Sequence, residues 1–213
     1  PAARGTPRLS PPWRRVCMGE RAALSGEGTR MNDYKALCDF QNLYKAHLRA
    51  RKGKRGTAEC IAFELELPQN LGRLQEELRN RTYRLSGYYS FEVFDPKRRT
   101  IHALHYRDRV VQHCLCDDVL APVLEKRLTY DNAACRVGKG TDFARARLSG
   151  FLREHFKQHG TNGYILRCDV RKFFDNINHD VLKGILGELP LASDTLALLH
   201  HIIDSYHTGE GRG

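Results

Sequence analysis

One apolar run that carries a carboxylate constrains the fold of this chain more than any other feature of its sequence. The run covers 164–170, and its composition predicts a short buried strand with Asp169 near the end. A carboxylate at the end of a buried strand is costly unless another group compensates its charge. Mg²⁺ prefers carboxylate oxygen, so these residues favour a divalent metal as the compensating partner. Phe173, which is expected in the core, and Phe174 follow, then a polar turn and a helix that begins near His179. Asn178 is expected to cap this helix, and His179 is expected at the surface.

The remainder of the chain is predicted to be mainly helical, with one hairpin. Apolar residues alternate over 88–94 and again over 100–104, and the segment between them has turn-forming Pro and basic residues, which indicates an antiparallel hairpin. Apolar residues recur at helical spacing elsewhere. The predicted helices cover 32–48, 57–67, 70–80, 106–127, 141–156, 179–186 and 193–206. In the helix at 70–80, Leu71, Leu74 and Leu78 are expected to face inward.

Four blocks of this sequence resemble, in order, blocks of bacterial reverse transcriptases. The first three are 91–101, 106–113 and 130–141, and the fourth is Asp169 with aromatic residues four and five positions later. The resemblance covers roughly 32–213 and is to enzymes of the diversity-generating retroelement, group II intron and retron type. Each block alone is a weak signal, but four in the right order are specific.

The resemblance implies an α/β (α+β) fold, the fingers and the first part of the palm of a right-hand polymerase. Residues 31–160 would be the mainly helical fingers with the hairpin, and 161–213 the start of the palm, ending before the second catalytic aspartate motif. A portion of this kind is expected to be inactive alone. Residues 1–30 are rich in Pro, Gly and Arg without periodicity, so we expect a poorly ordered leader or a non-native extension.

The resemblance also implies template-directed nucleotidyl transfer with two Mg²⁺ ions. Asp169 would be the catalytic carboxylate and a metal ligand, and Val170 would offer its backbone carbonyl to the metal; an ordinary acid at a strand end or turn is the alternative for Asp169. Phe174 matches the position that stacks under the incoming sugar and excludes a 2′-hydroxyl; packing in the core is its alternative. Arg136 and Lys139 would hold the nucleotide triphosphate, and the alternative is that they are solvated loop charges.

The formal net charge of +10 suits a polyanion or an acidic membrane, although a soluble basic protein without such a partner is the alternative. Cations in and after the hairpin are expected to meet template phosphates, which positions nucleic acid without reading its sequence. These cations are Lys97, Arg98, Arg99, Arg107 and Arg109. For Arg107 and Arg109 the alternative is a structural ion pair with Asp108 or Glu125.

The expected partners are an RNA template, a DNA primer and deoxynucleoside triphosphates, with an accessory RNA-binding protein in a diversity-generating system. No apolar run reaches the length of a membrane span. Seven cysteines without paired metal-site spacing favour the reducing cytoplasm. Two alternatives stay open: a non-catalytic RNA-binding module from a degenerate or truncated polymerase, and a zinc-dependent nucleic-acid protein, which the Cys and His spacing disfavours.

Overall fold

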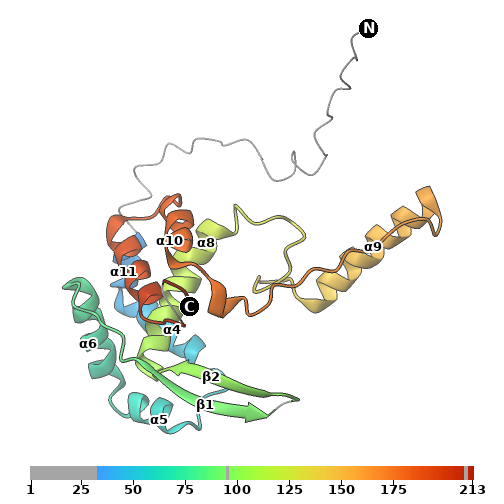
Figure 1. The fold of residues 1–213 in the computed structure, drawn as a ribbon. Coiled ribbons are helices and arrows are strands. Elements are labelled where there is room, and N and C mark those ends of the chain that lie inside the picture. The colour runs from blue at the N-terminus through green and yellow to red at the C-terminus, as the bar shows by residue number, and fades with distance from the viewer. Residues whose placement is uncertain (1–32, 95, 209–210) are drawn as a thin grey trace.

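The chain folds into a mainly helical body with one antiparallel hairpin (Figure 1). The computed structural model describes residues 33–94, 96–208 and 211–213. This mixed α+β composition confirms the coarse fold class predicted from the sequence, whereas the division into polymerase fingers and palm stays a prediction. The expected leader, 1–30, lies outside the described residues.

The described elements follow one another with short connections, except around the long helix α9. They are α3 (Asp33–Leu37), α4 (Phe40–Ala50), α5 (Ala58–Leu65), α6 (Leu67–Arg79), β1 (Tyr88–Phe94), β2 (Arg98–Leu104), α7 (Tyr106–His113), the π-helix η1 (Cys114–Leu120), α8 (Ala121–Leu124), α9 (Thr141–His159), the 3₁₀ helix η2 (Phe174–Asn176), α10 (His179–Gly187) and α11 (Ser193–Asp204).

Helix boundaries follow local capping and proline chemistry. The predicted helix 32–48 is two helices, because Asp39 caps α4 by accepting a hydrogen bond from the Asn42 amide at 3.0 Å. Pro68 lies in the first turn of α6, where its missing N–H costs little. Pro122 lies in the first turn of α8, directly after η1, so the predicted helix 106–127 changes its winding there.

The predicted hairpin is confirmed. Its strands pair from Tyr88 opposite Leu104 to Phe94 opposite Arg98, so β2 begins two residues earlier than predicted. Most side chains of both strands are exposed, and Leu104 at the end of β2 is buried. The hairpin therefore extends from the body and meets it at one end (Figure 1).

Apolar faces of α3, α4, α5, α6, α7, η1 and α11 contribute to the core. The predicted inward face of α6 is confirmed, because Leu71, Leu74 and Leu78 are at most 2% exposed. Val110 and Val111 of α7 are fully buried in the same cluster. Burial of such side chains, at roughly 25 cal/mol per Å², is the main force that holds these helices together.

The predicted buried strand at 164–170 is wrong. This segment forms neither helix nor strand, and the side chains of Ile165 and Leu166 are 81% and 87% exposed. A strand needs a neighbour for its backbone hydrogen bonds, and among the described residues β1 and β2 pair only with each other. His179, predicted at the surface, is also corrected: it is 2% exposed, and Asn178 caps α10 as predicted.

Helix α9 extends to His159, three residues beyond its predicted end, and has no buried residue. It projects away from the core (Figure 1). Neither α9 nor any other helix in the described part of the chain is both long and apolar enough to cross a membrane.

Candidate nucleic-acid interface

The far end of the hairpin presents three exposed cations. Arg98 donates to the Glu92 carboxylate at 2.6 Å, and its guanidinium lies 5.9 Å from the centre of the Phe94 ring. Lys97 and Arg99 are exposed and have no ion pair among the described residues. Of the three cations at this end of the hairpin, two thus have no ion pair among the described residues, while Arg98 is partly neutralised by Glu92.

Arg109 joins the two strands at the opposite end of the hairpin. Its Nε donates to the Leu104 carbonyl at 2.8 Å, and its Nη2 donates to the Tyr89 hydroxyl at 3.0 Å. Tyr89 lies on β1 and Leu104 ends β2, so one planar guanidinium holds both strands. The structure therefore engages Arg109 within the protein and shows no pairing with either predicted acid.

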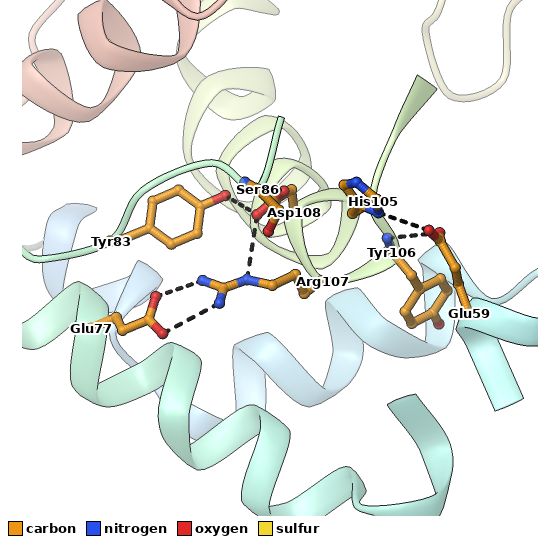
Figure 2. A network of polar contacts seen from close by, with 8 residues as sticks. All are labelled: Glu59, Glu77, Tyr83, Ser86, His105, Tyr106, Arg107 and Asp108. Carbon is orange, nitrogen blue, oxygen red and sulfur yellow. Dashed lines mark hydrogen bonds and ion pairs between the residues drawn. The ribbon is translucent and has the colours of Figure 1, made fainter. Parts of the chain in front are cut away.

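The neighbouring Asp108 forms a buried polar network (Figure 2). Its carboxylate is fully buried and accepts hydrogen bonds from the Tyr83 hydroxyl and the Ser86 amide, each at 2.8 Å. Burial, followed by the charge of Asp108, raises the pKa of Tyr83 above its ordinary value, which keeps the phenol a donor. A buried charge is tolerated when its oxygen atoms are paired in this way.

Arg107 completes that network from the other side. Its guanidinium makes two hydrogen bonds to Glu77, at 2.5 and 3.3 Å, and its Nε lies 3.5 Å from Asp108 (Figure 2). Of the two roles that the sequence allows for Arg107, the structure shows the structural ion pair. Sequence patterns did not reveal Glu77, because it lies 30 residues upstream on α6, with no spacing signal that links the two.

The two cations predicted to hold a triphosphate face their own loop. Arg136 binds both carboxylate oxygens of Glu125 and donates to the Thr129 carbonyl at 2.7 Å, which leaves its side chain 8% exposed. Lys139 donates to the Tyr130 carbonyl, with Nζ 4.2 Å from the centre of that ring. The structure thus places Arg136 and Lys139 in one loop, but the side chains of both already bind neighbouring protein groups.

Asp169, Val170 and Phe174 lie on an exposed stretch of chain. Asp169 has no ion pair or hydrogen bond from its side chain among the described residues. The Phe174 ring is 74% exposed and packs edge-on against Phe173, with centroids 5.3 Å apart. Phe173 was predicted in the core and is 54% exposed, because the strand that should carry it inward is absent from this part of the chain.

The chemistry of the donors at Asp169 suits a hard cation, but their number is small. A carboxylate and the Val170 carbonyl are oxygen ligands of the kind that Mg²⁺ takes, with water filling the rest of its octahedron. Across 33–94, 96–208 and 211–213, no three His, Cys, Asp or Glu side chains gather in a way that holds a metal. The described residues alone therefore do not assemble a two-metal site.

A cleft of about 500 Å³ lies between α5, α6 and the start of α7, beside the residues that flank the hairpin. Glu59, Arg73, His105 and Arg107 contribute charged or ionisable groups to its wall. Glu59 accepts hydrogen bonds from His105 at 2.8 Å and from the Tyr106 amide at 3.1 Å. The amide belongs to the N-terminus of α7, where the helix dipole stabilises a carboxylate. Sequence patterns did not reveal this cleft, because its residues come from three separate segments.

Comparison with known proteins adds no family to these observations. Neither the models of known protein families nor the curated proteins contain a match to this chain. The resemblance to reverse transcriptases rests on the residues of this sequence.

Proposed function

We propose that this chain is the fingers and first palm portion of an RNA-directed DNA polymerase, in which the hairpin contacts nucleic acid. The observation that carries the proposal is the hairpin itself: β1 and β2 form where the first block of the resemblance lies, with Lys97, Arg98 and Arg99 exposed at its far end. Such cations release counterions when they neutralise phosphates, which provides affinity for any RNA or DNA strand.

In this proposal the remaining residues act around the reacting nucleotide. Asp169 supplies a carboxylate for Mg²⁺, and bound Mg²⁺ supplies charge neutralisation at the transferred phosphoryl group. Phe174 excludes a ribonucleotide by occupying the space of its 2′-hydroxyl. Arg136 reaches a triphosphate only by giving up Glu125, because that ion pair uses its guanidinium in this structure.

A non-catalytic RNA-binding module is the second candidate. One observation favours it: Asp169 has no neighbouring carboxylate cluster among the described residues. Both candidates use the hairpin in the same way, so binding alone does not separate them.

Two experiments test the proposal in turn. The chain should bind an RNA template annealed to a DNA primer, with an affinity that falls steeply between about 50 and 200 mM salt; absence of binding would refute both candidates. The DNA that follows codon 213 then separates them. An open frame encoding an aromatic-x-Asp-Asp hairpin supports the enzyme, and a stop codon supports the module.

The product of such an open frame allows a direct test of Asp169. With a poly-rA template, oligo-dT and Mg²⁺, we expect primer extension that Asp169→Ala abolishes. Asp175→Ala is the matched control, because Asp175 is an acid six residues later to which we assign no metal role. Equal loss in both variants would withdraw the catalytic role of Asp169.

A further inference from the structure

The direction of the hairpin depends on what holds its root, because a two-stranded ribbon is marginally stable alone in water. Most of its side chains are exposed, and it meets the body at one end. On one side of the root, the Tyr88 hydroxyl lies 3.0 Å from the Ser205 hydroxyl, and the Tyr88 ring packs against Tyr206. The other side is held by α7.

Two adjacent residues of α7 bind the two ends of the hairpin. Asp108 accepts from the Ser86 amide, two residues before β1, and Arg109 donates to the Leu104 carbonyl at the end of β2. Arg109 also reaches back to Tyr89 on β1. The entry and the exit of the hairpin are therefore attached to one turn of one helix.

That helix is firmly seated, so the attachment is to a rigid base. Val110 and Val111 directly follow the pair and are fully buried in the core. Asp108 itself is fully buried and hydrogen-bonded to Tyr83, which is 3% exposed (Figure 2). A close-packed interior has low compressibility, so α7 moves little relative to the rest of the core.

We infer that Asp108 and Arg109 are positioning residues that set the direction of the hairpin, so that Arg109 acts on nucleic acid through the strands and not by binding phosphate. The inference rests on the proposed function insofar as the hairpin contacts nucleic acid. Its physical basis is preorganisation: a hairpin held in one direction loses less conformational freedom when its cations bind.

Two substitutions separate positioning from direct phosphate binding. Arg109→Lys keeps the charge but replaces a two-pronged guanidinium with a single ammonium. Tyr89→Phe removes the acceptor on β1 and changes no charge. We expect each to weaken RNA binding roughly fivefold, the effect of one hydrogen bond, with the slope of log affinity against log salt unchanged. Arg99→Lys, at an exposed site without side-chain hydrogen bonds among the described residues, is the matched control and should bind like the parent.

Direct phosphate binding by Arg109 gives a different pattern. Arg109→Lys would then bind nearly as well as the parent, and Tyr89→Phe would have no effect. Arg109→Gln would lower the salt slope by about 0.7–0.9, the value of one neutralised phosphate. That pattern would overturn the inference. The double variant of Tyr89→Phe and Arg109→Lys should be no worse than the more affected single variant, because both break the same link.

Hydrogen exchange of the strand amides tests the inference without RNA. Amides of β1 and β2 should exchange faster in Arg109→Lys and Tyr89→Phe, with α7 amides and the melting temperature unchanged, and Arg99→Lys should match the parent. Exchange that does not change in either variant overturns the inference even if affinity falls. Failure of the parent chain to bind RNA refutes the proposed function instead, and the exchange result still decides how the hairpin is held.

Discussion

A buried carboxylate is the residue on which the hairpin root depends. Asp108 is fully buried, and a buried charge is stable only when its hydrogen bonds are complete. Tyr83 and Ser86 donate hydrogen bonds to Asp108, and Arg107 adds an ion pair at 3.5 Å. Removal of any one partner should therefore cost more than removal of an ordinary surface hydrogen bond.

Tyr83→Phe tests that cost. The variant removes only the hydroxyl that donates to Asp108 at 2.8 Å, so the carboxylate loses a partner in the core. We expect the free energy of unfolding to fall by about 1–3 kcal/mol, measured by urea denaturation. Tyr130→Phe removes the same group from a ring that is 66% exposed and should change stability by less than about 0.5 kcal/mol. Equal changes in the free energy of unfolding of the two variants would show that the buried hydrogen bond does not stabilise the fold.

His47 makes stability depend on acidity. It is fully buried, and burial lowers the pKa of its imidazole, although Glu64, at 3.3 Å from Nε2, opposes the shift. The unfolded chain therefore takes up the proton first as pH falls, and protons then favour unfolding. We expect the free energy of unfolding to be highest above about pH 6.5 and to fall below it. In His47→Gln this component of the pH dependence should vanish; an unchanged profile would contradict the assignment.

The two roles that the sequence allows for Phe174, sugar selection and packing in the core, predict different effects on stability. Its ring is 74% exposed, so Phe174→Ala should change the free energy of unfolding by less than about 0.5 kcal/mol. A buried Phe would cost about 3–5 kcal/mol. In an enzyme completed by the downstream frame, the same variant should raise ribonucleotide incorporation relative to deoxynucleotide incorporation. A large drop in melting temperature with an unchanged ratio would return Phe174 to the core and withdraw its role in sugar selection.

At the scale of elements, local sequence patterns predicted those features that depend on residues close together in the chain. The periodicity of Leu71, Leu74 and Leu78 identified the buried face of α6, and the turn residues after Phe94 identified the hairpin. Long-range pairing was beyond such patterns. Arg107 meets Glu77 from another helix, and nothing in the spacing of either residue indicates it.

The segment 164–170 shows the same limit for strands. Its apolar composition predicts burial, but burial of a strand requires a neighbour, and none of the described segments provides one. The candidate site was therefore predicted in part. The hairpin cations lie at an exposed end as expected, whereas Arg107, Arg109 and Arg136 are engaged within the protein.

The hairpin as an element should account for part of the salt dependence of RNA binding. Changing Lys97, Arg98 and Arg99 together to Ala should lower the slope of log affinity against log salt, by about 0.7–0.9 for each phosphate that is no longer neutralised. Because Arg98 already pairs with Glu92, Arg98→Ala alone should lower the slope less than Lys97→Ala. An unchanged slope in the triple variant would remove the hairpin from the interface. Lys126→Ala, at an exposed cation outside the hairpin, controls for net charge.

At the scale of the whole molecule, the chain has a packed body and a helix that stands outside it (Figure 1). The core unites α3, α4, α5, α6, α7, η1 and α11, whereas α9 buries no residue. Helices in proteins gain most of their stability from packing of an apolar face, and α9 has no buried residue to provide it. The N-cap of α9 is Gly140, which has no side chain to accept a hydrogen bond. Helix α9 should therefore open independently of the core.

A matched pair of glycine substitutions tests this division. Gly150 lies within α9 and Gly72 within α6, and a Cβ added at either position meets no atom within 4 Å. Replacement of a helical Gly by Ala stabilises a helix by roughly 1 kcal/mol. Gly72→Ala should thus raise the global free energy of unfolding, because α6 belongs to the core. Gly150→Ala should slow hydrogen exchange in α9 and leave the global value unchanged. If both variants raised the global value equally, α9 would unfold together with the core, and its stability would depend on packing against the rest of the chain.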